Sequence, residues 1–359
     1  MARSKKNDVL QRAPLQHVAL LRALPGVGDF LCCVPALRAL RAALPEAQIS
    51  LIGLPSAAAL QQRFHRYVDK LLLFPGFSGI PEVSIDRARY PAQLAELQQQ
   101  NFDLLIQMHG NGTFINEFVE LVGAKVLAGF YLPGRSYCPD GTHFLPYPAA
   151  EPEVWRHLLL LEYLGIPLQG DHLEFPLGPA DSDALHDALG GRPLAPYEYA
   201  CVHPGAGDPG RRWSPELFAH VADELAAQGL QVVITGTQAE TAVTAAVVSA
   251  MRHSPLDLTG RTTLGALAAL VGKARLVICN DTGISHVAAA LGTPSVVIFP
   301  GPASPGADPS GWPPLDRVRH RFIQPQANTP DMAAAVGIDP RSVLEQASQL
   351  LAWDWRSYA

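Results

Sequence analysis

The sequence lacks the features that place a protein in a membrane or on nucleic acid. No window of it is long and uncharged enough to span a bilayer, and the basic start MARSKKND is not followed by the apolar stretch of a signal peptide. Domains that bind nucleic acid usually carry a basic excess, whereas this chain has a net charge of -6 at pH 7. We therefore expect a cytoplasmic globular protein that does not take nucleic acid as a partner.

Cysteine and histidine are present without an informative spacing. The chain has 5 cysteines but no CxxC pair, and 12 histidines but no HExxH motif, so neither a disulfide framework nor a transition-metal site is expected. Cys32 and Cys33 are adjacent, while Cys201 and Cys279 lie within apolar runs typical of buried strands. We expect reduced core residues, no metal and no cofactor.

The chain does contain a repeated alternation of short apolar runs and amphipathic stretches. This alternation predicts βα units around parallel sheets, and 359 residues, 48% of them hydrophobic, suffice for two domains. The predicted strands include 17–24, Ile49–Leu54, Lys70–Phe74, Leu104–Met108, Val126–Gly129, 198–204 and Gln231–Thr235. The predicted helices include Asp29–Ala43, Pro91–Gln100, Pro215–Gln228, Ala239–Met251, Leu264–Lys273 and Arg341–Trp355.

A shift in composition marks the expected domain boundary. The stretch FPLGPADSDALHDALGGRPLAP is rich in Pro and Gly around one short helical piece. We place a first domain at residues 1–178, a second at 179–340, and a terminal helix at 341–359 that is expected to pack back toward the first domain. Two Rossmann-like α/β domains facing across a cleft would suit an acceptor in one half and a donor in the other. Dehydrogenases have a related two-domain plan, so the motifs must decide between a dehydrogenase and a protein that binds a donor and an acceptor.

The loop after the first strand, LPGVGDFL, carries an acid where a dinucleotide site would carry phosphate. Gly26 and Gly28 resemble the start of a dinucleotide fingerprint, but the third glycine is absent and Asp29 would repel a pyrophosphate. Asp29 could simply cap the following helix. Alternatively, it is a general base that takes a proton from a bound hydroxyl.

The second domain opens with CVHPGAGDPGRRWSPELF, in which a glycine-containing loop leads to paired arginines before a helix. Guanidinium groups match phosphate oxygens in bidentate geometry, so Arg211 and Arg212 are candidates for a phosphate contact. The alternative is that both are ordinary surface arginines beside a tryptophan.

The next strand of this domain, in VVITGTQAET, also runs into a turn of small residues. Gly236 lies in this turn, and Glu240 begins the following helix. A carboxylate near a nucleotide site typically holds ribose hydroxyls. Otherwise Glu240 is an acid favoured by the helix dipole in the first turn.

A third strand of this domain ends in the turn NDTGISH. Its small residues lie where a helix N-terminus offers unpaired N–H groups to an anion, although any such junction also favours capping residues. Because three strand ends should converge on one crevice, we predict a nucleotide-diphosphate site there. The turn contributes the candidates Asp281, Thr282, Gly283, Ser285 and His286.

Taken together, these motifs resemble glycosyltransferase family nine, the ADP-heptose:lipopolysaccharide heptosyltransferases, which have the GT-B fold. The resemblance covers nearly the whole chain, and DTGISH followed by an alanine-rich helix and GTP is its most specific part. It implies Asp29 as catalytic base, Arg211 on donor phosphate where the family usually has Lys, and Glu240 on the ribose. It also implies that the DTG turn contacts the diphosphate and sugar, with Ser285 and His286 alongside.

The resemblance further implies inverting, metal-independent transfer of a sugar, with ADP-heptose as the expected donor, to a hydroxyl of a glycan or lipopolysaccharide-core acceptor. Transient association with the inner face of the cytoplasmic membrane would follow from a lipid-linked acceptor. The first domain should bind the acceptor, with Gly28 in the first loop and His109 and Asn111 in QMHGNGTF as weaker candidates. A core or capping role for His109 is the alternative.

Two other functions fit the same two-domain plan. A nucleotide-sugar epimerase of the GT-B fold would need acid and base groups around a single substrate and no acceptor groove. A non-catalytic nucleotide-sugar or glycan binding protein would not depend on Asp29.

Overall fold

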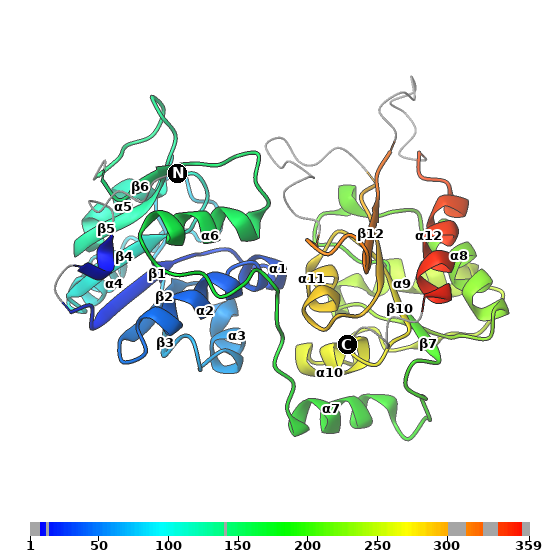
Figure 1. The fold of residues 1–359 in the computed structure, drawn as a ribbon. Coiled ribbons are helices and arrows are strands. Elements are labelled where there is room, and N and C mark those ends of the chain that lie inside the picture. The colour runs from blue at the N-terminus through cyan, green and yellow to red at the C-terminus, as the bar shows by residue number, and fades with distance from the viewer. Residues whose placement is uncertain (1–7, 12–13, 140–141, 301–313, 326–336, 354–359) are drawn as a thin grey trace. The chain divides into compact units, whose positions relative to one another are not determined.

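The computed structural model describes residues 8–11, 14–139, 142–300, 314–325 and 337–353. The chain divides by its contacts into two compact units, unit 1 (Met1–His172) and unit 2 (Leu173–Ala359). The division falls between His172 and Leu173, whereas sequence composition places the boundary after residue 178. Each unit contains one parallel six-stranded sheet, as expected for α/β domains (Figure 1).

The sheet of unit 1 has the strand order β3-β2-β1-β4-β5-β6. Its central strands are nearly continuous apolar runs, because helices cover a parallel sheet on both faces. Its strands are β1 (His17–Leu21), β2 (Gln48–Gly53), β3 (Lys70–Leu73), β4 (Phe102–Gln107), β5 (Ala124–Tyr131) and β6 (Phe144–Pro146). Its α-helices are α1 (Val27–Leu31), α2 (Val34–Ala43), α3 (Ala58–Arg63), α4 (Tyr90–Gln98), α5 (Ile115–Val122) and α6 (Glu153–Tyr163).

The predicted helix Asp29–Ala43 is two helices. The chain leaves α1 at Cys32 and enters α2 from Cys33, with Pro35 in the first turn of α2. Proline has no N–H to donate to the preceding turn and is tolerated only at the start of a helix. The apolar spacing that suggested one helix continues across this break, so the prediction was wrong about the continuity of the element.

The sheet of unit 2 has the corresponding order β12-β11-β10-β7-β8-β9. Its strands are β7 (Tyr199–His203), β8 (Gln231–Ile234), β9 (Leu256–Asp257), β10 (Leu276–Asn280), β11 (Ser295–Ile298) and β12 (His320–Ile323). Its α-helices are α7 (Pro179–Leu189), α8 (Pro215–Ala227), α9 (Thr241–Ala250), α10 (Leu264–Val271), α11 (Gly283–Ala290) and α12 (Pro340–Ala352). Helix α9 is preceded by the 3₁₀ turn η4 (Gln238–Glu240), so the predicted helix from Ala239 begins in 3₁₀ geometry.

The terminal helix α12 packs on unit 2. Val343, Ala347 and Leu350 are buried in the hydrophobic core that also contains Trp213 and Phe218. Helix α12 thus belongs to the core of unit 2, and the expectation that it also packs back toward the first domain stays a prediction. Burying this apolar stripe against α8 and β11 removes it from water, which is the main stabilising contribution available to such a helix.

Both sheets reverse their strand order beside their first strand. In unit 1, β1 pairs with β2 on one side and β4 on the other, and in unit 2, β7 pairs with β8 and β10. In open α/β sheets, ligands bind at the carboxyl ends of the strands at this switch point. The residues that follow β1 and β4, and those that follow β7 and β10, are therefore the places to look for chemistry.

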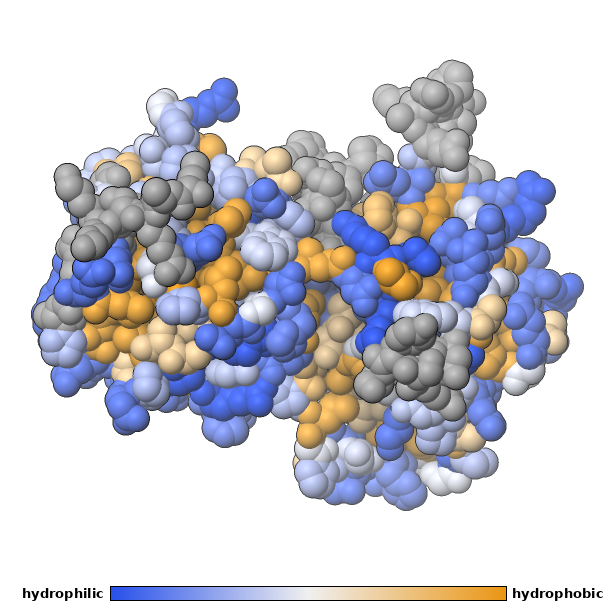
Figure 2. Space-filling model, in the orientation of Figure 1, coloured by the Kyte–Doolittle hydropathy of each residue, from blue (hydrophilic) through white to orange (hydrophobic). Residues whose placement is uncertain are grey.

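The surface of each unit mixes hydrophobic and hydrophilic residues on the face drawn in Figure 2. Large hydrophobic side chains that are exposed include Leu73, Phe114 and Leu121 in unit 1 and Val318 in unit 2. Within the described part of the chain, no helix combines the length and the hydropathy that crossing a membrane requires.

Candidate functional site

The loop after β1 brings an aspartate to the first turn of a helix. Gly26 is the N-cap of α1, with φ -79° and ψ 142°, and Asp29 follows within the helix. A Cβ at position 26 would collide with Oδ2 of Asp29, so the glycine leaves room for the carboxylate. The Asp29 side chain is 23% exposed. Asp29 is thus not the N-cap itself, and its carboxylate is accessible to solvent.

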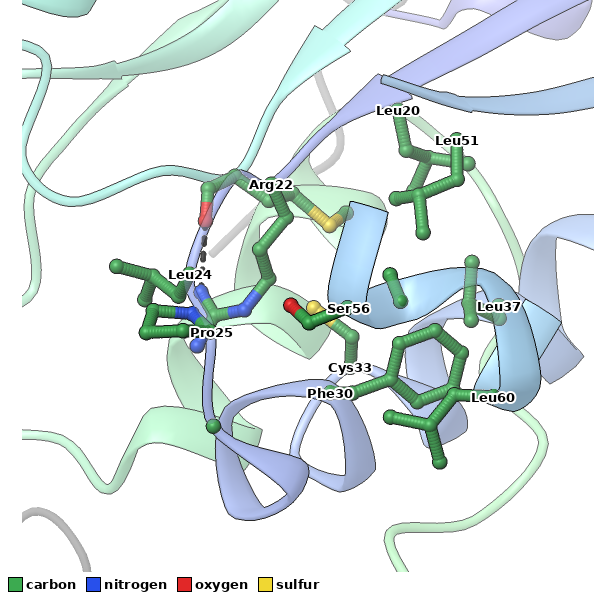
Figure 3. Close-up of a pocket in the computed structure, with 13 residues that line it drawn as sticks. Leu20, Arg22, Leu24, Pro25, Phe30, Cys33, Leu37, Leu51, Ser56 and Leu60 are labelled. Carbon is green, nitrogen blue, oxygen red and sulfur yellow. Dashed lines mark hydrogen bonds between the residues drawn. The ribbon is translucent and has the colours of Figure 1, made fainter. Parts of the chain in front are cut away.

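Arg22, the first residue after β1, binds this loop through its buried side chain. It is 5% exposed, and its Nε donates to the main-chain oxygen of Asp29 at 2.9 Å. NH1 donates to the main-chain oxygen of Met108 at 2.8 Å, the bond dashed in Figure 3. NH2 lies 3.6 Å from Oδ1 of Asp29. A single buried side chain therefore joins the acidic loop to the end of β4.

Glu153, at the start of α6, supplies the buried counter-charge. Its Oε1 lies 3.0 Å from NH1 of Arg22, and its Oε2 accepts from NH1 of Arg156 at 2.8 Å. Burial alone would raise the pKa of Glu153, but the two guanidinium groups outweigh burial and help to lower the pKa to about 2. The carboxylate is therefore ionised at neutral pH.

His157 completes this cluster as a neutral side chain. Arg22 can only donate, so its 3.0 Å contact with Nε2 leaves the ring proton on Nδ1, which faces the main-chain oxygen of Cys32 at 3.3 Å. Burial, assisted by the charge of Arg22, lowers the pKa of His157 to about 4.

The candidates for acceptor binding lie close to this cluster, at the end of β4 and in α1. His109 is 7% exposed, its Nδ1 accepts from the N–H of Ala23 at 3.3 Å, and burial lowers its pKa to about 4. Asn111 accepts from both the N–H and the hydroxyl of Thr113, at 3.1 Å and 2.7 Å, and so shapes the turn. Gly28 is buried inside α1. These contacts fit a structural role for each residue and leave the acceptor role a prediction.

In unit 2, Asn280 ties together the loops that follow β7 and β10. This buried side chain accepts from the main-chain N–H of Trp213 at 3.0 Å and donates to the main-chain oxygen of Pro204 at 2.8 Å. Trp213 is 1% exposed and packs edge-on against Phe218, with ring centroids 5.1 Å apart. The glycine-containing loop is therefore anchored on both sides.

The two predicted phosphate-binding arginines have different partners. NH2 of Arg211 donates to the carboxylate and to the main-chain oxygen of Asp281, at the end of β10. Arg212 instead donates from Nε and NH2 to the main-chain oxygen of Ala206, at 2.9 Å and 2.7 Å, within the glycine loop. The Arg211 side chain is 45% exposed. Arg211 thus lies by the DTG turn, while Arg212 holds the loop.

Glu240 is the last residue of the 3₁₀ turn η4, which follows β8, and it is buried. Oε2 accepts from the N–H and the hydroxyl of Thr237, at 2.7 Å and 2.9 Å, and lies 3.9 Å from Nε2 of His203. Burial lowers the pKa of His203, and the charge of Glu240 partly offsets this effect. A Cβ at Gly205 would collide with Glu240, and one at Gly236 would meet the methyl group of Thr244. Glycine at both positions leaves room for the Glu240 side chain.

The NDTGISH turn forms the N-terminus of α11, as predicted. Thr282 is the N-cap, and its hydroxyl oxygen is buried without a hydrogen-bond partner among the described residues. The Ser285 hydroxyl donates to the main-chain oxygen of Thr282 at 2.8 Å, so it is already engaged. His286 is 4% exposed, and burial lowers its pKa. Gly283 begins the helix and presents no side chain to an approaching group.

The switch points thus assemble two sets of residues. Unit 1 gathers Asp29 with Arg22, Glu153 and His157, of which sequence reasoning found only Asp29. Unit 2 brings Arg211, Asp281 and the start of α11 together, and Glu240 lies in η4, after the neighbouring strand β8. Asn280 was inside the quoted turn but was not recognised as an anchor. Across the described ranges, no group of three or more His, Cys, Asp or Glu side chains is arranged to hold a metal ion.

Comparison with known proteins gives a consistent result. The pattern that defines glycosyltransferase family 9 (heptosyltransferase) matches residues 92–334. Lipopolysaccharide heptosyltransferase 3 of Escherichia coli K12 is 33% identical over 284 residues, which is 76% of this chain and 79% of that protein. Lipopolysaccharide heptosyltransferase 2 of the same strain is 30% identical over 152 residues, 40% of this chain, and that alignment spans 43% of the relative's length.

The fold also matches a solved structure from this group. The ADP-heptose lipopolysaccharide heptosyltransferase II of E. coli superimposes with a TM-score of 0.71 at 21% identity, over 96% of this chain and 100% of that one. At this identity the likeness establishes the fold, which is the GT-B fold of two α/β units, each with a sheet of parallel strands.

Proposed function

The chain belongs to glycosyltransferase family 9, the heptosyltransferase family predicted from its motifs, and on that basis we propose that it transfers heptose from ADP-heptose to a hydroxyl of a lipopolysaccharide-core acceptor. The observation that carries the donor assignment is the grouping at the switch point of the second sheet. Arg211, the buried hydroxyl of Thr282 and the N-terminus of α11 all lie there, and together they suit a diphosphate.

The pairing of Arg211 with Asp281 defines how the donor would enter. The guanidinium is already held beside α11 by that carboxylate, and a diphosphate would either share it or displace it. The Arg211 side chain is 45% exposed and can reach a ligand, whereas the Asp281 side chain is 12% exposed, so sharing the guanidinium costs less than leaving this carboxylate unpaired. The carboxylate of Glu240, in the space kept by Gly205, would take the ribose hydroxyls.

In the proposed reaction, Asp29 removes the proton from an acceptor hydroxyl as the oxygen attacks the anomeric carbon. The bond to the diphosphate breaks on the opposite side, so the anomeric configuration inverts. Arg211 and the N–H groups of α11 stabilise the charge that develops on the leaving diphosphate, which is the kind of preorganised electrostatic help that dominates many enzymes. No metal is needed for this step.

Unit 1 would hold the acceptor, with His109 and Asn111 near the hydroxyl. A lipopolysaccharide core is linked to lipid during its assembly, so the protein would work at the inner face of the cytoplasmic membrane as a peripheral enzyme.

A donor screen tests the proposal. Thermal shift with ADP-heptose, ADP-hexoses, UDP-hexoses and GDP-hexoses should show the largest stabilisation for ADP-heptose, since a ligand that binds the native state raises the apparent stability. Products are then analysed with and without a heptose-deficient lipopolysaccharide core. Acceptor-dependent release of ADP supports transfer, whereas sugar conversion without an acceptor would indicate an epimerase. Binding without turnover under all conditions would indicate a binding protein.

A further inference from the structure

Arg22 is shared between two carboxylates of unequal exposure. Its NH1 lies 3.0 Å from Oε1 of buried Glu153, and its NH2 lies 3.6 Å from Oδ1 of Asp29. The NH2 atom is buried and has no hydrogen-bond partner among the described residues. Figure 3 shows the guanidinium beside Pro25, at the loop that carries Asp29. The tighter pairing is thus with Glu153, and the looser one is with the acid of the loop.

The other titratable groups packed around Arg22 are uncharged at neutral pH, apart from Arg156. Burial lowers the pKa of His109 and of His157 to about 4, raises that of Cys33 to about 12, and raises those of Cys32 and Tyr147. The cluster therefore holds two cations, Arg22 and Arg156, against two anions, Glu153 and Asp29.

We propose that Arg22 is a positioning residue that holds Asp29 for proton abstraction, and that Glu153 keeps Arg22 from pairing fully with Asp29. This inference rests on the proposed role of Asp29 as the base. The Nε bond to the main-chain oxygen of Asp29, at 2.9 Å, fixes the loop, and the bond to Met108 fixes the arginine.

The division of Arg22 between the two acids has a chemical purpose. A carboxylate paired directly with an arginine has its pKa lowered by about 1–3 units, which makes it a weaker base. Glu153 takes the closer contact, at 3.0 Å against 3.6 Å, so in the proposed arrangement Asp29 keeps more of its basicity than a direct ion pair would leave it. Removing Arg22 and removing Glu153 should therefore shift the titration of Asp29 in opposite directions.

The test compares Arg22→Met, Arg22→Lys and Glu153→Gln. In Arg22→Met the apparent pKa of the acid limb in the pH profile of kcat/KM should rise by about 1 unit, because the cation near Asp29 is gone. In Glu153→Gln this apparent pKa should fall by about the same amount, because Arg22 can then move toward Asp29. Arg22→Lys keeps the charge but not the planar fork, so the limb should stay in place while kcat falls and the KM for the donor is unchanged.

Arg41→Met is the control for loss of a partly buried arginine, whose side chain is 16% exposed. Arg41 lies in unit 1, binds the main-chain oxygen of Ala47 at 2.7 Å and pairs with Asp69 at 2.7 Å, and it contacts neither Asp29 nor Glu153. Its removal should lower the melting temperature and leave the acid limb where it is. The proposal is wrong if the acid limbs of Arg22→Met and Glu153→Gln have the same apparent pKa as the acid limb of Arg41→Met. Should Arg22→Met fail to fold, Glu153→Gln and Arg22→Lys still decide the outcome.

A second readout does not depend on turnover. The carboxyl carbon of Asp29, assigned in ¹³C-aspartate-labelled protein by its absence from Asp29→Asn, can be titrated directly in wild type and variants. Opposite shifts in Arg22→Met and Glu153→Gln support the proposal even if the wild type does not use ADP-heptose, in which case the proposed function fails separately. Identical titrations overturn the role of Arg22.

Discussion

Each unit carries an arginine and an aspartate at the switch point of its sheet, and the two pairs differ in exposure. The Arg22 side chain is 4% exposed and shares its charge between Asp29 and Glu153, whereas the Arg211 side chain is 45% exposed and bonds directly to Asp281. A buried cation cannot leave its place without stranding a buried carboxylate. A cation that is 45% exposed can contact a ligand while it stays paired with its carboxylate, here Asp281. The same residue types therefore suit positioning in unit 1 and ligand binding in unit 2.

The largest effect is expected at Asp29. Asp29→Asn keeps the size of the side chain but cannot accept the proton, so kcat should fall by about 10²–10⁴-fold while donor affinity and thermal stability barely change. Steady-state kinetics with a lipopolysaccharide-core acceptor measure this. Turnover within a few-fold of wild type would show that Asp29 is not the base. The proposed difference between the Arg22–Asp29 and Arg211–Asp281 pairs would then be wrong.

The next largest effect is expected at Arg211. Arg211→Ala loses a charge-assisted contact to phosphate, worth roughly 1.5–3 kcal/mol, so the dissociation constant for ADP should rise by about 10–150-fold. Arg212→Ala is the matched control, because Arg212 is bound to the carbonyl of Ala206 and should affect ADP binding less. Calorimetric titration with ADP measures both. Equal affinity in wild type and Arg211→Ala would contradict the donor assignment in unit 2.

A smaller difference between the units is expected in acid. Burial by itself would raise the pKa of three carboxyl groups, those of Asp103 and Glu153 in unit 1 and of Asp223 in unit 2. Hydrogen bonds, and Arg22 and Lys125 in unit 1, nevertheless lower all three pKa values to about 2. Because these folded-state values lie below the unfolded ones of about 4, the stability they supply is present above about pH 4 and is lost as the pH falls toward 2. Each carboxylate contributes on the order of 1–2 kcal/mol.

Unit 1 should therefore lose more stability than unit 2 as the pH falls from about 4 toward 2. Urea unfolding followed by proteolysis and mass spectrometry assigns the loss to each unit. Asp103→Asn should remove part of the acid dependence of unit 1 and none of that of unit 2. Equal losses in both units would show that the two cores are electrostatically alike.

The smallest effect is expected from chelation. If Arg211 and the N-terminus of α11 meet the charge of the leaving diphosphate, transfer should proceed at the same rate in EDTA as in magnesium. Loss of activity in EDTA with recovery on adding magnesium or manganese would mean that unit 2 needs a cation that its side chains do not replace.

Local pattern was enough to predict most elements, because apolar spacing is a property of neighbouring residues. The strands around Leu20, Leu105 and Val233 and the helix after Ser214 are where alternation and capping indicate them. The continuous helix over Asp29–Ala43 was wrong because apolar spacing was weighed above Pro35, which marks the break. The terminal helix was recognised, but its place in the core of unit 2 was not, because an apolar stripe does not specify which surface covers it.

The sequence by itself determined the class of this protein, its family, and the residues that stand at the ends of the strands, since these depend on short motifs and on composition. Only the tertiary structure decided what those residues touch. Arg22 meets His157 across 135 positions and Arg211 meets Asp281 across 70, and contacts at such separation depend on strand order and on which helix covers which face. The division of Arg22 between Glu153 and Asp29 arises because charges buried together must balance, and no local pattern in the chain records which charges will be buried together.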